Sequence, residues 1–593
     1  MKTPKVMIAF LTLSALVTQS FAPSAQAAST YEPDNSLRAD PLQSSKQMGG
    51  NLEVGEFTGA AIYNYPIALP AGRNGMAPSV QLTYNSQDSA LDNIAGFHWS
   101  LNTASIKRIN KKGVEKLYDR NDFVANGPFG GGELIPTALD DGHHGQYGEK
   151  NERSFAQYEY LADNSWRVTD KRGTRYTFGA MEEGRQFDPA DGSRTFQWML
   201  EEVRDLNGNG IVFTYFRDGN QLYPKTIRYT NHGAEEGIFE VRFLPFADGS
   251  AGASRIDSHT SFAEGFQVDT QRLVTGIEVK AEGQLRRKFE IGYSTVDPLT
   301  KNTIGRITET GYDLNGNATI LPATTFDYTP SVVHWGETTD YIYPGYFQTC
   351  YTECESTGAT WDMNGDGLTD FETVQNGAPQ RFLNNGKNGW STTAGNLLSI
   401  NQPSLPNLWS KPIDFDGDNS NEIVTSYSSQ IDGLTHSTIQ SSSRPAISDT
   451  IAIPFALPSY GMNDNGASVA DLNGDGLPDI LQSHSYFYSG TWSSTSTTDK
   501  ATCLNQDGNS CVDTNLWEAP VIFVSASGTQ QSARQHYVQD CNTDGLADVV
   551  YTGSGGGNWI NDGKGGWIPN ATRCDLPPMD SLTTRSLDAN GDG

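Results

Sequence analysis

The sequence lacks the catalytic motifs that residue spacing can reveal. It contains no Gly-x-Ser-x-Gly elbow, no HExxH helix and no Walker loop. The glycine runs at 130–132 and 555–557 lack the lysine and the following helix that a phosphate-binding loop needs. His143 and His144 lie in an Asp/Gly-rich stretch, which is typical of a solvated loop. We therefore expect that this chain is not an enzyme.

Basic residues and long apolar runs are also scarce. The chain has 41 lysines and arginines against 70 aspartates and glutamates, for a formal net charge of -29. So acidic a chain is poorly suited to bind nucleic acids or anionic membranes, which attract basic surfaces. Beyond the N-terminus, no segment approaches the roughly 18 apolar residues of a membrane-spanning helix. We therefore expect no nucleic-acid partner and no transmembrane segment in the mature chain.

The N-terminus has the pattern of a cleaved export signal. Lysines precede an apolar run at residues 6–17, and Ala-Gln-Ala at 25–27 is a small-x-small cleavage pattern. This pattern predicts a signal peptide at residues 1–27, followed by a polar linker at 28–48. The mature protein is then expected to be secreted and extracellular, with periplasmic or cell-surface retention left open.

Cysteine is rare, and all six cysteines lie at or beyond residue 350. No CxxC pair and no histidine pair at ligand spacing occur, which argues against a zinc site. An exported chain meets an oxidising environment, which favours disulfides. Several connectivities are open, and closeness in sequence favours Cys350 with Cys354, Cys503 with Cys511, and Cys541 with Cys574.

The most informative feature that is present is an acidic nine-residue loop, which occurs five times in the last 232 residues. Side-chain oxygens at positions 1, 3, 5 and 9, with the backbone carbonyl of position 7, form the shell that a hard cation needs. Glycine at position 6 of four copies permits a sharp turn. The loops therefore predict Ca²⁺ as a cofactor. The predicted ligands are Asp362, Asn364, Asp366, Leu368 and Asp370 in loop one; Asp414, Asp416, Asp418, Ser420 and Glu422 in loop two; Asp471, Asn473, Asp475, Leu477 and Asp479 in loop three; Asp540, Asn542, Asp544, Leu546 and Asp548 in loop four; and Asp588, Asn590 and Asp592 in loop five.

The surroundings of the loops exclude an EF-hand and indicate propeller blades. An EF-hand needs a glutamate at position 12 and flanking helices, whereas these loops have threonine, glutamine or tyrosine there and precede short strand-like segments. Successive loops begin 52, 57, 69 and 48 residues apart, a period typical of blades. Residues 382–390 and 559–567 add a second repeated element, an Asn/Asp-Gly turn between apolar residues. Over about residues 340–593 the chain resembles the FG-GAP/VCBS repeats of integrin-type β-propellers, which implies calcium-loop blades.

Two further segments begin like the acidic loops and serve as internal controls. Residues 205–211 and 313–319 carry asparagine at position 5, and the residue at position 9 is apolar, so a single carboxylate remains in each. We interpret both as simple hairpin turns. Because Asp, Asn and Gly favour turns for steric reasons alone, a turn without metal is also the alternative to calcium in the five acidic loops.

Residues 49–335 have a different pattern, which predicts strands joined by glycine turns. Val80, Leu82 and Tyr84 alternate with polar residues, and residues 166–178 and 277–291 have the pattern of hairpins. No helical period of useful length occurs. We therefore expect an all-β chain, with a β-strand-rich domain at 49–335 and an incomplete calcium-loop β-propeller at 336–593.

Three stretches of the first domain, residues 59–86, 96–108 and 167–179, resemble the N-terminal region of the SpvB family. That region is shared by the plasmid virulence protein that names the family, the B components of insecticidal Tc toxin complexes and many Rhs/YD-repeat proteins. The family places it directly before FG-GAP blades, in the order found here. The resemblance therefore implies a β domain followed by a propeller.

We interpret the residues that carry this match as architectural. Trp99 is expected in the core. Arg73 either pairs with a buried carboxylate or contacts a partner protein, and we favour the structural role. His98 stands where the family usually has glycine, which predicts a slightly different turn. Positive φ is expected at Gly72, Gly75 and Gly96.

Together the two resemblances imply a secreted toxin or virulence protein of the SpvB/Tc/Rhs type. We expect this chain to be the structural and partner-docking part of such a protein. Its partners would be other toxin-complex components, and any effector activity would lie C-terminal to it. Two alternatives stay open: an extracellular propeller that binds a cell-surface protein or glycan, and a calcium-dependent polysaccharide lyase. Loop five ends at Gly593 without its position 9. We therefore also expect that the natural reading frame either continues beyond this residue or was truncated.

Overall fold

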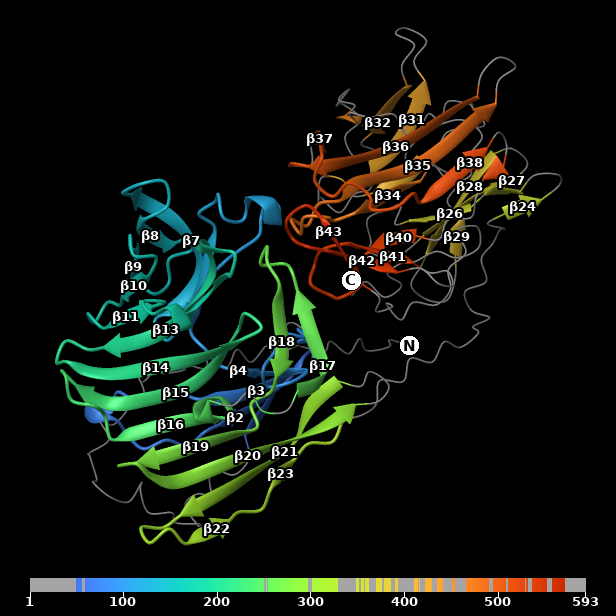
Figure 1. The fold of residues 1–593 in the computed structure, drawn as a ribbon. Helices are drawn as coiled ribbons and strands as arrows, with labels where there is room; N and C mark the ends of the chain where they lie inside the picture. Colours follow the sequence, from blue (N-terminus) through green and yellow to red (C-terminus); the bar gives the residue numbers. More distant parts are fainter. Residues whose placement is uncertain are drawn as a thin grey trace, which may run out of the picture.

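Regular structure in the described part of the protein consists of β-strands and four short 3-10 turns, so the expected all-β fold is confirmed. The computed structural model comprises an N-terminal half, residues 50–328, and a group of C-terminal sheets between residues 348 and 570 (Figure 1). The predicted signal peptide, the linker at 28–48 and the boundary near residue 335 lie outside the described residues. The described residues are 50–55, 59–249, 252, 254–296, 301–328, 348–350, 354–356, 358–361, 370–375, 378–384, 390–392, 410–413, 415, 422–428, 435–440, 451–453, 466–489, 494–507, 510–527, 530–531, 536–551 and 557–570.

The N-terminal half begins with a four-stranded antiparallel sheet. The alternation predicted around Leu82 holds, because Val80 and Leu82 are buried while their polar neighbours are more exposed. Trp99 is buried as expected, and its Nε1 donates a hydrogen bond to the Tyr328 hydroxyl at 2.7 Å. The strands of this sheet are β1 (Asn51–Val54), β2 (Ala61–Pro66), β3 (Gln81–Asn85) and β4 (Trp99–Leu101).

The turns of this sheet correct two interpretations from the sequence. Gly75 and Gly96 have positive φ values of 75° and 95°, as expected, but Gly72 has a φ of -84°. A Cβ on Gly72 would lie 1.7 Å from the Met76 carbonyl oxygen, so close backbone approach requires glycine there. Arg73 is exposed, which contradicts its interpretation as the partner of a buried carboxylate.

Eight strands then close into a barrel, because β13 pairs with both β11 and β5. Five aromatic rings meet inside it, with contacting centroids 4.7 to 6.1 Å apart: Phe123, Tyr147, Tyr160, Trp166 and Trp198. The barrel strands are β5 (Ser105–Arg108), β6 (Phe123–Gly127), β7 (Gly130–Leu139), β8 (Gly145–Glu149), β9 (Gln157–Tyr160), β10 (Trp166–Thr169), β11 (Arg175–Phe178) and β13 (Asp191–Arg204).

Strand β13 also begins a long curved sheet, which runs below the barrel in Figure 1. The hairpins predicted at 166–178 and 277–291 are confirmed as β10–β11 and β19–β20. The hairpin β17–β18 stands apart from the curved sheet and points towards the C-terminal sheets (Figure 1). The strands are β14 (Asn209–Asp218), β15 (Gln221–His232), β16 (Phe239–Leu244), β19 (Gly276–Ala281), β20 (Gln284–Val296) and β21 (Lys301–Tyr312), with β12 (Arg185–Asp188), β22 (Ala318–Ile320) and β23 (Thr324–Thr325) at the margins, and β17 (Ser254–Ser261) and β18 (Val268–Arg272) in the separate hairpin.

The C-terminal part contains four sheets, in each of which four consecutive strands pair antiparallel. In every one, an acidic loop separates the first strand from the second, so the predicted placement between strands is confirmed for loops one to four, while loop five lies outside the described residues. The strands are β26 (Gly358–Trp361), β27 (Asp370–Gln375), β28 (Ala378–Asn384) and β29 (Trp390–Thr392); β30 (Ser410–Ile413), β31 (Glu422–Ser428), β32 (Thr435–Gln440) and β33 (Ile451–Ile453); β34 (Ala467–Ala470), β35 (Asp479–Ser489), β36 (Ser494–Asn505) and β37 (Cys511–Thr514), extended by β38 (Val524–Ser527) and β39 (Gln530–Gln531); and β40 (His536–Gln539), β41 (Asp548–Tyr551), β42 (Asn558–Asn561) and β43 (Trp567–Asn570), while β24 (Gln348–Cys350) and β25 (Cys354–Ser356) form a separate hairpin.

The cysteines follow the predicted redox state where the structure describes them. Cys503 and Cys511 form a disulfide, as predicted. Cys541 is also disulfide-bonded, and its predicted partner Cys574 lies outside the described residues. Cys350 and Cys354 face each other in the register of β24 and β25, and their disulfide stays a prediction. In the described part of the chain, no helix is long and apolar enough to cross a membrane.

Candidate metal centre at the junction of the two halves

Loops three and four, residues 471–479 and 540–548, are folded by the same set of hydrogen bonds. In each, the aspartate at position 1 accepts backbone N–H groups from positions 4, 5 and 6, and the aspartate at position 5 accepts the N–H of position 7. Asp471 accepts from Gly474, Asp475 and Gly476 at 2.7, 3.2 and 2.8 Å, and Asp540 from Thr543, Asp544 and Gly545 at 2.7, 3.3 and 2.9 Å. The position 5 bonds are Asp475 with Leu477 at 3.0 Å and Asp544 with Leu546 at 2.9 Å.

Position 9 ties each loop to its own sheet and to the preceding one. The two carboxylate oxygens of Asp479 accept the N–H groups of Leu472 and Asn505, both at 2.8 Å. The Asn505 side-chain amide then donates to the Phe415 carbonyl in loop two at 2.6 Å. The same chain of bonds recurs one sheet later, from position 9 of loop four through Asn561 to the Leu472 carbonyl. These repeated hydrogen bonds, from position 9 through an asparagine to the preceding loop, set the register between successive sheets.

The loop carboxylates are held largely out of water. Burial, with the neighbouring Asp475 charge, raises the pKa of Asp471 to about 6. Burial likewise raises the pKa of Asp544 to about 6 and that of Asp548 to about 7, and it raises the pKa of Asp479 well above its usual value. Each loop thus concentrates acidic groups in a dehydrated space, and a bound cation would relieve that repulsion.

Loop four leaves a buried oxygen for which a hard cation offers a partner. Within the described residues, no three Asp, Glu, His or Cys side chains converge as a complete metal site. However, Asn542 Oδ1, at position 3 of loop four, is a buried oxygen without a hydrogen-bond partner. At position 3 of loop three, Asn473 Oδ1 accepts the Asp475 N–H at 3.1 Å, and the unpartnered atom is the donor Nδ2. The position 3 amides, the position 1 and 5 carboxylates and the position 7 carbonyl have the oxygen chemistry that calcium prefers. The residues present therefore fit calcium, and its ligands stay a prediction.

The two control segments satisfy themselves without an ion, as predicted. Asp313 accepts the N–H groups of Asn315 and Asn317 at 2.8 Å, and the Asn317 side-chain amide donates to its second oxygen at 2.8 Å. Asp205 is bonded in the same way by Asn209 in the turn between β13 and β14. Aspartate at position 5 of the acidic loops cannot make this donation. With an apolar residue at position 9 as well, each control turn keeps one carboxylate, whose oxygens accept hydrogen bonds within the turn.

The remaining acidic loops lie mostly outside the described residues. This applies to residues 362–369 of loop one, to 414 and 416–421 of loop two, and to the whole of loop five at 588–593. Asp370 and Glu422, at position 9 of loops one and two, begin β27 and β31. The calcium ligands predicted in these three loops stay predictions.

Loop three touches the N-terminal half through the barrel loop, which we define as residues 109–122 between β5 and β6. The Asn473 carbonyl accepts the Val114 N–H and the Asn110 side-chain amide, both at 2.8 Å. Lys112 and Lys116 donate to Gln506 at 3.2 and 2.8 Å. Position 3 of the acidic loop is therefore a direct contact between the two halves.

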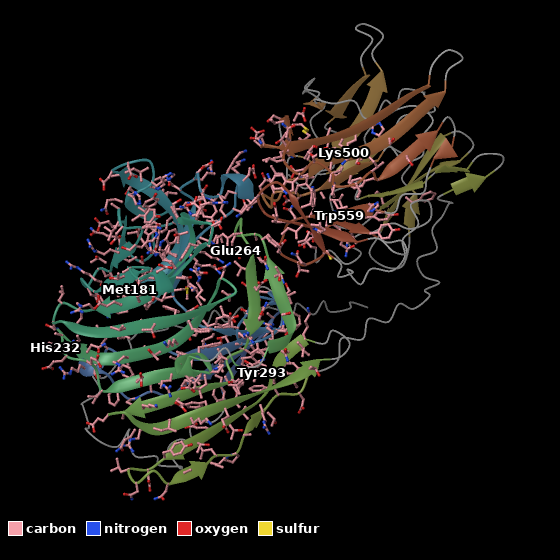
Figure 2. All side chains as sticks on the ribbon, in the orientation of Figure 1. Met181, His232, Glu264, Tyr293, Lys500 and Trp559 are labelled. Carbon is pink, nitrogen blue, oxygen red and sulfur yellow. A yellow bond between two sulfur atoms is a disulfide. The ribbon has the colours of Figure 1, made fainter. Side chains whose placement is uncertain are left out.

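Loop four makes equivalent contacts with the hairpin β17–β18. The Phe262 N–H donates to Asp544 at 2.8 Å, and the Asn542 amide donates to the Thr260 carbonyl at 3.2 Å. Figure 2 shows Glu264 at the tip of this hairpin, where it faces the C-terminal sheets. Nearby, Lys564 pairs with the buried carboxylate of Asp188 at 2.9 Å. Both acidic loops of known geometry thus lie at the junction.

A hydrophobic cluster fills the space between these polar contacts. Val114, Leu117 and Phe262 from the N-terminal half are buried against Leu472 and Leu546, the position 2 residue of loop three and the position 7 residue of loop four. Apolar burial contributes about 25 cal/mol per Å², so this cluster adds attraction between the halves to that of the polar contacts. The acidic loops supply its polar rim.

Arg108 fixes the barrel loop from inside the barrel. Its guanidinium is buried with no carboxylate partner among the described residues, and it donates to the carbonyls of Thr195, Leu117 and Arg120 at 2.9, 3.2 and 2.7 Å. It also lies 4.8 Å from the centroid of the Phe123 ring, within range of a cation–π attraction. Arg108 thereby holds the segment that contacts loop three.

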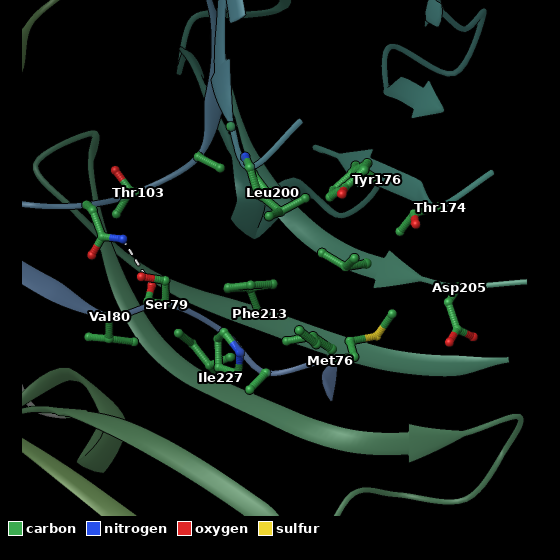
Figure 3. A pocket seen from close by; sticks show the side chains of 18 of the residues that line it. Met76, Ser79, Val80, Thr103, Thr174, Tyr176, Leu200, Asp205, Phe213 and Ile227 are labelled. Carbon is green, nitrogen blue, oxygen red and sulfur yellow. Dashed lines mark hydrogen bonds between the residues drawn. The ribbon is translucent and has the colours of Figure 1, made fainter. Parts of the chain in front are cut away.

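A separate pocket of about 720 Å³ lies in the N-terminal half, away from the acidic loops. Figure 3 shows Met76, Val80, Leu200, Phe213 and Ile227 around it, with Asp205 at one end. Its lining is mainly apolar, and the segment 74–80, which carries part of the SpvB resemblance, forms one wall. It is a feature of the β architecture that sequence patterns did not indicate.

Sequence reasoning does not identify the residues of either half that position the acidic loops. Arg108 of the N-terminal half lies in a segment with a family resemblance only, and Asn505 and Asn561 of the C-terminal sheets match no motif that assigns them a role. Asn561 could have been found, because it lies in the repeated element at 559–567 that follows loop four. The contacts of the barrel loop join residues more than 350 positions apart, as in Asn110 with Asn473, and no local pattern indicates them.

Comparison with known proteins identifies the N-terminal region. Residues 56–246 match the family model described as Salmonella virulence plasmid 65kDa B protein. Proteins named mono(ADP-ribosyl)transferase SpvB, from Salmonella typhimurium and Salmonella enteritidis, are 29% identical over 185 residues, or 27% of this chain and 30% of each relative. The chain therefore spans only 30% of the length of these relatives.

Two solved structures share the fold over most of the chain. A chain of the Tc holotoxin pore of Photorhabdus luminescens matches 90% of this chain and 30% of its own length, with a TM-score of 0.57 at 18% identity. A chain of TcdB2-TccC3 without its hypervariable C-terminal region matches 88% of this chain and 29% of its own length, with a TM-score of 0.52 at 17% identity. The resemblance to SpvB and Tc toxin proteins is confirmed, and at these identities the structural likeness concerns the fold alone.

These relatives also contradict one expectation. We expected that the chain is not an enzyme, whereas the curated relatives are named as mono(ADP-ribosyl)transferases. The expectation rested on missing short motifs. Catalytic groups are recognised by geometry and not by sequence position, so the lack of such motifs was insufficient ground for it.

Proposed function

We propose that this chain is the β-scaffold of a secreted toxin of the SpvB/Tc type, in which calcium-loop blades form a propeller that docks toxin-complex partners. The observation that carries the proposal is the shared fold with a Tc holotoxin chain over 90% of this chain. The family match at residues 56–246 supports the same assignment. In the described C-terminal residues, four successive sheets each contain four consecutive antiparallel strands with an acidic loop after the first strand, and this repeat supports the propeller.

Calcium is the proposed cofactor of these blades. Buried loop carboxylates with raised pKa values and the buried, unpartnered Asn542 Oδ1 support it. Asp471, Asn473, Asp475 and Leu477, and their equivalents in loop four, would hold the ion, which supplies positive charge and no chemistry of its own. Extracellular calcium modules typically bind with a Kd of about 10⁻⁴ to 10⁻³ M, which suits an exported protein.

The partner role is tested by purification from the native secreting cell. The tagged chain, isolated from the culture medium in 2 mM calcium, is expected to bring down other toxin-complex components, identified by mass spectrometry. A matched preparation in excess chelator serves as the control, because loss of the blades should release the partners. A chain that purifies alone in calcium would contradict the partner-docking proposal.

The names of the curated relatives support a second proposal about activity. We propose that the protein takes part in ADP-ribosylation, without assigning the reaction to residues of this chain, because the match covers 30% of each relative. Incubation with labelled NAD⁺ and host-cell extract is expected to label protein targets. An unlabelled extract, beside a positive control with an active transferase, would contradict this second proposal.

A further inference from the structure

The pocket of about 720 Å³ in the N-terminal half has no role in the proposed function. It opens where the barrel separates from the curved sheet. Residues 202–204 of β13 pair with 210–212 of β14, whereas residues 197–199 of β13 pair with β5. Strand β14 continues along β15 as far as Asp218, so the two layers diverge, and the segment 74–80 forms a further wall. The volume lies in the range of about 300–1,000 Å³ that is typical of small-molecule sites.

The walls of this pocket are mainly apolar, and the apolar lining continues to the solvent. Val80, Leu200 and Ile227 line it and belong to the core of the N-terminal half. Leu206 also lines it but is 79% exposed, so this side chain lies at the mouth. A Cβ on Gly173 would lie 3.0 Å from Leu206 Cδ2, which shows that the turn between β10 and β11 packs against this leucine. Water against these walls makes few hydrogen bonds, so an apolar ligand that displaces it gains free energy.

Arg172 provides the charged group that is open to a ligand. Three charged residues line the pocket, namely Asp170, Arg172 and Asp205. Asp170 accepts two backbone N–H groups of its own turn and the Tyr176 hydroxyl. Asp205 accepts two backbone N–H groups of its turn and the Asn209 side-chain amide. The Arg172 guanidinium, in contrast, is exposed and forms no hydrogen bond or ion pair within the described part of the chain. Its donors suit an anionic acceptor such as a carboxylate.

We propose that this pocket binds an elongated apolar molecule that ends in an anionic group, of the class of a fatty acid, with its chain against the apolar walls and its carboxylate on Arg172. Figure 3 shows Thr103 and Asp205 at opposite ends of the lining, an arrangement that suits an extended chain. Lys171, beside Arg172 in the same turn, adds a second positive charge near the mouth. Because the pocket lies away from the acidic loops, this binding is independent of calcium and goes beyond the proposed function.

Isothermal titration calorimetry of the full chain tests this proposal with dodecanoate and the chain-matched cation dodecyltrimethylammonium, both below the concentrations at which they form micelles. Dodecanoate is expected to bind at least about tenfold more tightly than the cation, because the carboxylate alone can accept charge-assisted hydrogen bonds from Arg172. The affinity should be the same in calcium and in excess chelator. Arg172→Gln should weaken dodecanoate binding about tenfold. Lys171→Gln removes the same charge from the adjacent exposed residue, which does not line the pocket, and is the matched control, with an expected change below about threefold.

Two further variants test whether the ligand lies in this pocket. Met76→Trp places a larger side chain in the lining, and Leu206→Asp places a carboxylate at the exposed mouth, so each should weaken dodecanoate binding at least about tenfold. Thermal melting shows whether each variant is folded, and Leu206→Asp alone decides if Met76→Trp does not fold. No dodecanoate binding to the unaltered protein would overturn the proposal, as would equal affinities for the two amphiphiles. Binding that a folded pocket variant leaves unchanged, or equal losses in Arg172→Gln and Lys171→Gln, would overturn it as well.

Discussion

Arg108 holds the barrel loop, the segment of the N-terminal half that contacts loop three. It satisfies three carbonyl groups from two segments, and its ring contacts place it among the aromatic side chains of the barrel. A lysine offers a single ammonium group and cannot reach all three carbonyls with the planar fork of arginine.

We therefore expect Arg108→Lys to lower the free energy of unfolding of the N-terminal half by about 2–4 kcal/mol, since hydrogen bonds from charged donors contribute about 1.5–3 kcal/mol each. Urea unfolding followed by circular dichroism measures this. The control is Arg167→Lys, on an arginine that is 46% exposed and pairs with Glu159, where a change within about 0.5 kcal/mol is expected. Equal losses in both variants would contradict the role assigned to Arg108.

Gly96 illustrates a residue whose backbone and surroundings both require glycine. Its φ is 95°, and a Cβ there would lie 2.7 Å from the Asn302 carbonyl oxygen. Gly283 has a φ of 77° with open space around it, so Gly283→Ala incurs only the cost of the left-handed backbone, about 1–2 kcal/mol. Gly96→Ala is expected to lose at least about 1 kcal/mol more, because the carbonyl must also move. Thermal melting of the two variants compares them, and a smaller loss in Gly96→Ala would refute this reading.

His98 shows why the family resemblance was informative at the residue scale. It has a φ of 64°, in the left-handed region that glycine adopts most easily, at the position where the family resemblance predicts a different turn. The ring nitrogen Nδ1 lies 2.7 Å from the Asp88 carbonyl oxygen, so a polar bond offsets the backbone strain. The sequence indicated a changed turn there, and only the structure identified the bond that makes it tolerable.

At the scale of elements, the link from position 9 to asparagine determines how one sheet follows another. Asn561 donates through Nδ2 to the Leu472 and Ala547 carbonyls at 2.8 and 3.2 Å, and its N–H bonds Asp548. Because Asn505 occupies the equivalent place one sheet earlier, these bonds are part of the repeat. They explain why the acidic loop and the Asn/Asp-Gly turn that follows it recur in the same order along the sequence.

Asn561→Asp keeps the size of this side chain but replaces its donors with acceptors. Two buried carbonyls lose their partner and a carboxylate comes to lie beside Asp548, so we expect a loss of about 3 kcal/mol or more in the unfolding of the last two sheets. Asn74→Asp, at an exposed position, is the control and should change stability by less than about 0.5 kcal/mol. Denaturant unfolding monitored by tryptophan fluorescence measures both, and matching midpoints would exclude the proposed link.

The sequence predicted local elements well and their long-range partners poorly. Hairpins such as β10–β11 and turns such as the one at Asp205 follow from alternation and turn chemistry within about 15 residues. The barrel closes because Trp198 in β13 pairs with Ile106 in β5. The barrel loop contacts loop three, which lies far away in the sequence. Such pairings depend on the folded arrangement, and no periodicity in the sequence encodes them.

At the scale of the whole molecule, the two halves meet through apolar packing rimmed by acidic loops. Apolar burial at Val114, Leu117 and Phe262 brings the halves together, and loops three and four place desolvated acids at the edge of the contact. With a formal net charge of -29, the chain also carries self-repulsion that bound cations would reduce. Calcium binding in the loops would therefore stabilise the blades and the junction together.

The most direct test of this account is thermal melting of the full chain in 10 mM calcium and in excess chelator. At a Kd of about 10⁻⁴ to 10⁻³ M, each site adds about 1.4–2.7 kcal/mol at that concentration. We predict a rise in Tm of at least about 3 °C in calcium, and loss of most of that rise in a variant with Asp475→Asn and Asp544→Asn. Identical melting curves in calcium and chelator would contradict the claim that calcium bound in these loops stabilises the blades and the junction between the two halves.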